Sequence, residues 1–370
     1  MAAEESKIEK FISKTRSFFL KFHVQFLSVI LAFIVCSLIL LIVGYNPISV
    51  IVNIFIGSFV GKSNIGSTLV SMTTILLTGL SFLTSIKCGL FNIGMQGQFL
   101  MGAFLASLAG FAISLPAPLH IFLSVLAGTL GGVLWILPAL LLKIRRDASV
   151  LLTTLMLSFI APFFGLFLVR IPFNNPDTAV ADTPYIRPSA ELPRILPPSK
   201  LNIGFLISLV VAVILYVFLW KTEIGYKIRA VGFDKEASHF MGIDVSKYRG
   251  LGFVISGGLA GLAGSMQVLG VWGRFFMTEG RAGFSTAPGW MGIPVGLVGG
   301  LHPIGAMFSS LFFGALDSGF MYIDLFTNVP APFAGVLLGT IVVIISTPLL
   351  IKYLGEKISS ILGGSKWNSE

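Results

Sequence analysis

Three side-chain amides stand close together in an apolar stretch of the sequence, where they could recognise an uncharged solute. They are Asn92, Gln96 and Gln98, within GLFNIGMQGQFLMGAF. If this stretch is helical, Asn92 and Gln96 are four residues apart and share a face, whereas Gln98 points to another side. Amides donate and accept hydrogen bonds without carrying charge, so the pair could bind a hydroxylated or heteroaromatic solute. It could equally bond to neighbouring helices, which is the commoner use of amides in membranes.

Three hydroxyls in a later apolar stretch fall near one helix face and could add to such a pocket. They belong to Thr153, Thr154 and Ser158. Hydroxyls inside helices more commonly bond back to carbonyls of their own helix. The six polar residues together are the candidates for a solute pathway.

Other chemistry finds little support in the residues. The four histidines have no metal-ligand spacing, and no nucleophile motif precedes a helix. The nearest approach to an ATP-binding loop, residues 57–63, has three residues between its glycines where the motif needs four. Asp317 is the one carboxylate well inside an apolar stretch, which is thin support for ion coupling. We therefore expect a non-catalytic chain that binds no metal or cofactor and takes its energy from another subunit.

The elements that must position these side chains are membrane helices. Of the 370 residues, 55% are hydrophobic and 11% are charged, with a mean hydropathy of +0.92, which excludes a water-soluble chain. The apolar runs predict an all-α integral membrane protein with about ten transmembrane helices. The predicted spans are 24–43, 67–86, 89–113, 119–142, 149–169, 202–220, 250–271, 288–301, 303–323 and 332–351.

The span at 288–301 is too short to cross roughly 30 Å of hydrocarbon as one helix. It is rich in glycine, so we expect a broken element that either lines a transport route or packs closely against its neighbours. The apolar stretch 48–64 is also short, and its polar flanks predict an interfacial or re-entrant segment.

The distribution of basic residues predicts the orientation of the chain. With the N-terminus inside, 18 of the 25 Lys and Arg residues fall in cytoplasmic segments. We therefore expect both termini in the cytoplasm: an N-terminal segment 1–23, a single transmembrane domain 24–351 and a tail 352–370. The net charge of +9 then reflects membrane topology, so the expected partner is the lipid bilayer and not a nucleic acid.

Two loops stand out. The external loop 171–200 holds seven of the 18 prolines and is expected to be extended and ordered by packing, with Asp177, Asp182 and Glu191 exposed. It could receive an external partner or serve only as a solvated connector. The cytoplasmic loop 221–249 contains a predicted short helix that either inserts into a cleft on another protein or rests on the lipid surface. Asp234 is its expected N-cap, and Gly242 is expected to end it. Between them, Ala237, Phe240 and Met241 form an apolar stripe at i, i+3 and i+4.

Three segments of the sequence resemble one known family. FNIGMQGQFLMG at 91–102, RAVGFDKEASHFMGIDVSKYR with the following SGGLAGLAGSMQVLG, and GWMGIPVGLVGGLHPIG at 289–305 are similar to ABC importer permeases of the ribose, branched-chain amino acid and nucleoside class. Nucleoside-type permeases are the nearest subgroup. The resemblance implies a type II ABC importer-like helical bundle in a bacterial cytoplasmic (inner) membrane, with the helix of the 221–249 loop as its coupling helix.

The resemblance also implies partners and a solute. A separate cytoplasmic ATP-binding subunit would hold ATP and magnesium, a second permease subunit, expected to be a different chain, would complete the channel, and an external solute-binding protein would deliver the solute. The family's usual glutamate falls at Gln96, and the family's polar pattern also changes at Ser149, Val150 and Ser158. A nucleoside is therefore the first expectation. The alternatives are riboflavin or ribose or another pentose in the same kind of complex, an ion-coupled secondary carrier, and a membrane scaffold that transports nothing.

Overall fold

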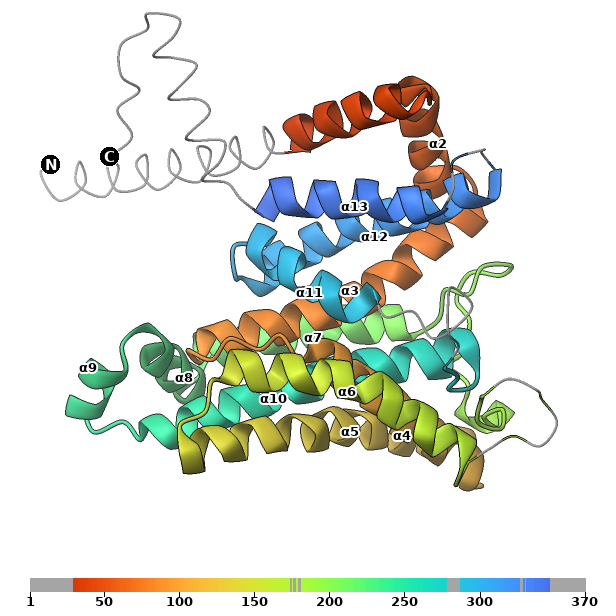
Figure 1. Ribbon diagram of the computed structural model, residues 1–370. Coiled ribbons are helices and arrows are strands. Elements are labelled where there is room, and N and C mark those ends of the chain that lie inside the picture. The colour runs from red at the N-terminus through yellow and green to blue at the C-terminus, as the bar shows by residue number, and fades with distance from the viewer. Residues whose placement is uncertain are drawn as a thin grey trace, which may run out of the picture. The chain divides into compact units, whose positions relative to one another are not determined.

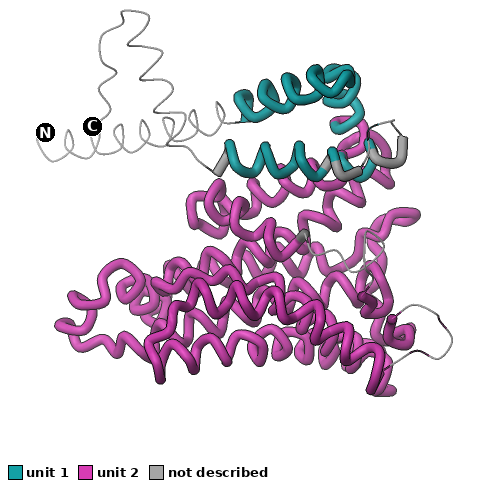
Figure 2. The backbone as a smooth tube through the Cα atoms, viewed as in Figure 1, with its two compact units in different colours: residues 1–54, 320–370 teal, residues 55–319 magenta. Residues whose placement is uncertain are grey.

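The structure is a computed structural model that describes residues 29–173, 175, 178, 181–277, 287–326, 329 and 331–346. The predicted cytoplasmic segments 1–23 and 352–370 lie outside the described residues. The chain divides into two compact units, Met1–Ile54 with Phe320–Glu370, and Phe55–Gly319 (Figure 2). All regular secondary structure in the described part of the chain is helical, as predicted, apart from two isolated β-bridges.

The helices follow the apolar runs of the sequence. The first unit holds the helix Val29–Val43 and α13 (Ala331–Ser346), and the helices α2 (Pro47–Phe59) and α12 (Pro303–Phe326) each contribute residues to both units. The second unit holds the remaining helices. These are α3 (Lys62–Lys87), α4 (Met95–Ala112), α5 (Ala117–Arg146), α6 (Val150–Arg170), α7 (Gly204–Lys221), α8 (Glu223–Phe233), α9 (Lys235–Phe240), α10 (Val245–Gln267) and α11 (Ala287–Val298).

Seven helices of the described residues are long and apolar enough to cross a membrane: α3 to α7, α12, and α10 together with the turn that extends it to Trp272. Four shorter apolar helices are Val29–Val43, Pro47–Phe59, Pro288–Val298 and Gly335–Ile344. The stretch 48–64, predicted to be interfacial or re-entrant, forms α2 from its second residue, the turn that follows and the first three residues of α3. The predicted broken element is confirmed, because α11 has 12 residues and ends in a turn where Gly300 has a φ of 65°.

α10 packs against α3, α4 and α5 through a seam of small residues (Figure 1). A Cβ atom on Gly261 would overlap the Gly128 carbonyl oxygen of α5, and one on Gly264 would overlap the Phe99 carbonyl oxygen of α4. Backbones approach this closely only where side chains are absent, which favours dispersion contacts between membrane helices. The glycine-rich run 257–264 is thus a packing surface.

Burial separates the interior helices from those that face the surroundings. The apolar windows of α3, α4 and α10 are 78%, 78% and 72% buried, whereas those of α5, α6 and α7 are 33%, 28% and 28% buried. Large apolar side chains such as Phe163 on α6 and Ile214 on α7 are exposed, as expected for helices in contact with lipid. α3, α4 and α10 therefore form the interior of the second unit.

Replacing Gly261 with Leu is expected to destabilise the fold, because the new side chain meets backbone atoms of α5 that cannot rotate away. Overpacking of this kind costs about 1–3 kcal/mol. The measurement is the temperature at which the detergent-solubilised protein loses its monodisperse size-exclusion peak. Gly250→Ala is the matched control, since its Cβ would lie 3.9 Å from Leu140. An equal loss of stability in both variants would contradict the packing seam.

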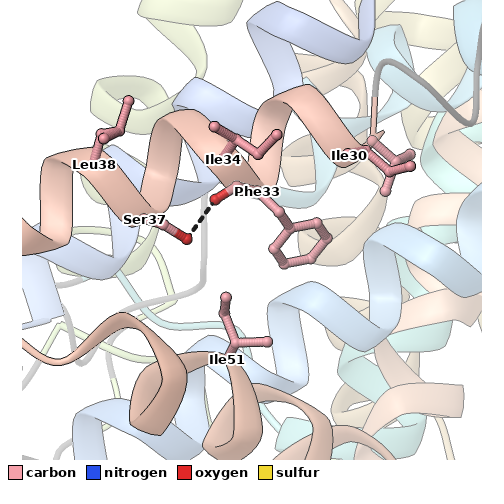
Figure 3. A pocket seen from close by; sticks show the side chains of 7 residues that line it. Ile30, Phe33, Ile34, Ser37, Leu38 and Ile51 are labelled. Atoms are coloured by element: carbon pink, nitrogen blue, oxygen red, sulfur yellow. Dashed lines mark hydrogen bonds between the residues drawn. The ribbon is translucent and has the colours of Figure 1, made fainter.

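An apolar hollow of about 430 Å³ lies in the first unit, between the helix Val29–Val43 and α2 (Figure 3). Its one polar side chain, Ser37, donates its hydroxyl to the Phe33 carbonyl oxygen at 2.7 Å. The hollow therefore presents hydrocarbon and suits a lipid chain better than a polar solute. Its lining residues are Val29, Ile30, Phe33, Ile34, Ser37, Leu38 and Ile51.

Candidate functional sites

The amides of Asn92 and Gln98 bond to each other. Asn92 Nδ2 donates to Gln98 Oε1 at 3.0 Å, and Gln98 Nε2 donates to Asn92 Oδ1 at 3.1 Å. Asn92 also donates to the Ser256 hydroxyl on α10 at 3.0 Å and accepts from the Gly94 N–H at 2.8 Å. The amide of Asn92 thereby uses both of its hydrogens and its oxygen inside the bundle.

The predicted helix face shared by Asn92 and Gln96 is wrong. α4 begins at Met95, so Asn92 lies in the non-helical segment before it, where its side-chain oxygen accepts from the backbone two residues on. Gln98, which was expected to point elsewhere, is the partner of Asn92, and Gln96 points in a different direction.

Gln96 faces the first turn of α11. Its side chain is 2% exposed, and Oε1 accepts from the Gly289 N–H at 3.1 Å. Its Nε2 has no hydrogen-bond partner among the described residues. An unpaired buried amide donor costs about 1–3 kcal/mol, so Gln96 Nε2 is a donor still available to a hydrogen-bond acceptor.

Two of the three predicted hydroxyls reach α4. Thr154 and Ser158 are buried, and their oxygens accept from the backbone N–H groups of Ile93 at 3.2 Å and Gly97 at 3.4 Å. Ile93 lies just before α4, and Gly97 lies in its first turn, where a helix N–H has no internal acceptor. Thr153 instead bonds back to carbonyls of its own helix. The structure thus brings Thr154 and Ser158 to α4 and leaves Thr153 apart.

A row of hydroxyls along α3 was missed by sequence reasoning. We name it the hydroxyl row, and four of its members bond to other helices. Ser71 donates to Asp317 Oδ2 at 2.8 Å and Thr74 to Gln267 Oε1 at 3.0 Å. Thr78 donates to the Pro288 carbonyl oxygen at 2.9 Å, and Ser81 to the Ser256 carbonyl oxygen at 2.7 Å. The signal was a spacing of three and four residues, which places side chains on one helix face. The row is Ser67, Ser71, Thr74, Thr78, Ser81 and Ser85.

The first turn of α11 joins the hydroxyl row to α4. The Pro288 carbonyl accepts from Thr78 on α3, and the next N–H, that of Gly289, donates to Gln96 on α4. A Cβ atom on Gly289 would overlap the Gln96 side chain, so the close approach requires glycine here. Thr74, Thr78 and Gln96 are buried and Gln267 is half-buried. Together they form one polar group of α3, α4 and α10 around this turn, which we call the polar path.

The predicted short helix of the 221–249 loop is confirmed as α9. Asp234 Oδ1 accepts from the N–H groups of Glu236 at 2.9 Å and Ala237 at 3.0 Å, and Gly242, with a φ of 76°, follows the last turn. Phe240 is 89% exposed and Met241 is 62% exposed. An apolar pair this exposed is not packed against the described residues of the chain, which suits a docking element.

Phe233 was missed as part of this surface. It is 96% exposed at the end of α8, and with Ala237, Phe240 and Met241 it completes an apolar spacing of four, seven and eight residues. That spacing was the available signal. We call these four exposed residues the docking surface.

The helices that flank the docking surface, α8 and α10, contact the end of α3. From this end the chain continues to Asn92. Arg249, at the start of α10, donates to the carbonyl oxygens of Cys88 at 3.3 Å and Gly89 at 2.5 Å. A Cβ on Gly232 of α8 would overlap the Lys87 carbonyl oxygen. α8 and the start of α10 therefore contact the segment that leads into α4.

Comparison with known proteins places these features in one family. Residues 64–346 match the family described as "Branched-chain amino acid transport system / permease component". The chain belongs to this family. It is a permease subunit of an ABC importer and a multi-pass membrane protein, in a family that works with ATP-binding and solute-binding partners.

Three relatives align with most of the permease. It is 34% identical to nucleoside ABC transporter permease protein NupB of Lactococcus lactis, over 83% of this chain and 85% of the relative. It is 30% identical to guanosine ABC transporter permease protein NupP of Bacillus subtilis, over 90% and 96%. It is 26% identical to glucose ABC transporter permease protein TsgB13 of Haloferax volcanii, over 88% and 87%. No solved structure matches the chain.

The described residues of the loop 171–200 of the permease are extended and ordered by packing, as predicted, apart from a single 3₁₀ turn, η1 (Pro188–Ala190). Its N–H groups donate to carbonyls at and after the π-helical turn η2 (Val268–Trp272): Leu192 to Leu269 at 2.9 Å, Ile186 to Gly273 at 2.8 Å and Thr183 to Phe275 at 2.8 Å. The loop thus stabilises a turn that directly follows Gln267 of the polar path.

The prediction that Asp182 is exposed is wrong. Asp182 is fully buried, and its carboxylate pairs with Arg274 and accepts from the Thr178 hydroxyl at 2.5 Å. Arg274, 92 residues later in the sequence, offsets the free-energy cost of burying the Asp182 carboxylate. Glu191 is exposed as predicted, whereas Asp177 lies outside the described residues.

Proposed function

We propose that this permease imports nucleosides across the cytoplasmic membrane of a bacterium. The observation that carries the proposal is the identity of 34% and 30%, over most of the chain, to permeases named for nucleosides and guanosine. The glucose permease at 26% identity makes a sugar the second candidate. The two solute classes share a polyhydroxylated ring, so a pathway of amides and hydroxyls suits both.

The polar path is proposed as part of the solute route. Its residues are Thr74 and Thr78, which are 2% and 0% exposed, with Gln96 and Gln267, and none of them is charged. An uncharged nucleoside offers ring nitrogens, carbonyls and hydroxyls to such groups, whereas an amino acid would leave two charges unpaired in a buried site. Asn92, Gln98, Thr154 and Ser158 are proposed to hold the start of α4 in place beside this route.

The partners follow the same proposal. The docking surface inserts into a cleft of a cytoplasmic ATP-binding subunit, which holds ATP and magnesium, while the loop 171–200 receives an external solute-binding protein. A second, different permease subunit completes the channel, and both termini lie in the cytoplasm. α9 presents apolar side chains with the charged Lys235 and Glu236 beside them. An apolar centre with a polar rim is typical of a helix that binds in a groove of a partner.

The rival readings have less support. Asp317 was the one residue that favoured an ion-coupled carrier, and its Oδ2 accepts from Ser71 of the hydroxyl row at 2.8 Å, a bond that joins α12 to α3. The relatives described above are named for nucleosides, guanosine and glucose, so riboflavin and pentoses stay predictions without a relative behind them.

Deleting the permease is expected to abolish ATP-dependent uptake of labelled nucleosides, and restoring the gene is expected to recover it. Competition by unlabelled guanosine, uridine and glucose then ranks the solutes, with the nucleosides expected to compete and glucose expected not to. A proton ionophore added while cellular ATP is maintained is the control for ion coupling. Loss of glucose uptake alone would favour the sugar, and loss of transport with the ionophore would contradict ATP coupling.

A further inference from the structure

Lys87 and Arg229 both lie over the ring of Trp220, at the end of the second unit where α8 and α9 are found. Lys87 Nζ lies 5.7 Å from the ring centroid of Trp220, and the Arg229 guanidinium carbon lies 5.2 Å from it. His302 packs edge-on against the same ring, with centroids 4.7 Å apart. The group, which we call the Trp220 cluster, joins the ends of α3 and α7, the middle of α8 and the residue before α12.

The positive charge of the Trp220 cluster is not neutralised by the described protein residues. Arg229 Nε donates to the Leu219 carbonyl, and Lys87 has no ion pair or hydrogen bond from its ammonium group among those residues. Burial, and then the charge of Lys87, lowers the pKa of His302, so the imidazole is neutral at pH 7 and can still donate a hydrogen bond. Lys87 and Arg229 thus supply two positive charges and His302 a neutral donor, and no anionic side chain among the described residues pairs with them.

The acidic side chains at this end of the bundle are engaged or positioned elsewhere. The segments 87–90, 143–149 and 221–249 hold ten basic and five acidic residues. Asp147 and Glu223 pair with Lys143 and Lys227, Asp234 and Asp244 cap helices, and Glu236 is exposed on α9. The local excess of positive charge is therefore open to an external anion.

The surroundings of the Trp220 cluster favour a lipid as the source of that anion. Val213 and Val217 lie on α7 two turns and one turn before Trp220, and they are 53% and 46% exposed. The helical spacing of 213, 217 and 220 places an apolar track on the same face as the ring. Tryptophan with a basic residue at the end of such a track is typical of the membrane interface.

We propose that the Trp220 cluster binds the phosphate of an anionic phospholipid, with Lys87 and Arg229 as its cationic ligands. The acyl chains lie along Val213 and Val217. A lipid held there links α3, which continues to Asn92, to α8, which leads to the docking surface. The site is independent of which solute the permease carries.

The test uses the full-length permease in nanodiscs of phosphatidylcholine with and without phosphatidylglycerol. Brominated lipids quench nearby tryptophan fluorescence, and subtracting the signal of Trp220→Phe isolates Trp220. Two cations near a lipid headgroup favour the anionic lipid by roughly 25-fold. Brominated phosphatidylglycerol is therefore expected to quench Trp220 at a far lower mole fraction than brominated phosphatidylcholine does.

Variants and a soluble anion separate the outcomes. Lys87→Gln, which removes an ammonium without internal bonds, is expected to lower the preference by about fivefold, and Lys87→Gln with Arg229→Gln is expected to abolish it. Arg145→Gln removes an exposed charge at the same end and is expected to leave it unchanged. Equal quenching by both lipids, or an equal effect of Arg145→Gln, would overturn the site. Loss of the preference on adding inorganic phosphate would assign it to a soluble anion and overturn the lipid.

Discussion

Replacing both Phe240 and Met241 with Asp is expected to abolish ATP-driven uptake while the permease itself still folds. The two side chains are 89% and 62% exposed, so they contribute little to the core of this chain. In a cleft of the ATP-binding subunit each would bury its apolar surface, worth about 1.5–3 kcal/mol per side chain. Two carboxylates would lose that energy and add the cost of burying charge. Binding should therefore weaken at least about 100-fold.

The measurement is copurification of the ATP-binding subunit with the permease, together with uptake and ATP hydrolysis in proteoliposomes. Phe240→Leu with Met241→Leu is the matched variant, because it keeps an apolar surface on α9 and is expected to retain most of the activity. A normal size-exclusion profile of the Asp variant separates lost docking from lost folding. Full uptake by the Asp variant with the ATP-binding subunit still attached would remove α9 from coupling.

α9 was predictable because each of its determinants lies within nine residues. The cap, the apolar stripe and the stop run from Asp234 to Gly242, and the structure repeats all three. The seam of α10 was predictable for a similar reason, since a run of glycine and alanine has little use in a membrane helix except close packing. Local sequence decided both elements.

The environment of the amides was not predictable because it depends on distant residues. Asn92 bonds to Ser256, 164 positions later, and this contact helps to keep residues 91–93 out of the helix that their apolar character suggests. The burial of Asp182 was not predicted for the same reason, because its partner Arg274 follows both α7 and α10 in the sequence. The spacing of the hydroxyl row could be recognised in the sequence. It was missed because its threonines and serines are scattered through an apolar stretch that resembles an ordinary transmembrane helix.

Gln96→Ala is expected to reduce nucleoside uptake without reducing the amount of assembled permease. If Nε2 donates to the solute, its loss removes one hydrogen bond, worth about 0.5–1.5 kcal/mol. The KM for uptake should then rise by about two- to tenfold. The truncation also frees the Gly289 N–H, so a second variant must separate the two effects.

Gln96→Glu supplies that separation, because a carboxylate oxygen can still accept from the Gly289 N–H while the donor is lost. This variant is expected to assemble normally and to favour nucleosides that present an amino group over those that present a carbonyl. Gln98→Ala is the structural control: it leaves one N–H of the Asn92 amide without its acceptor in the bundle, at a cost of about 1–3 kcal/mol, so it should lower the yield of folded protein. Competition assays across guanosine, adenosine and uridine measure the preference. Unchanged kinetics in Gln96→Ala would place Gln96 outside the solute route, because an unpaired buried donor on that route must contribute to the passage of a polar solute.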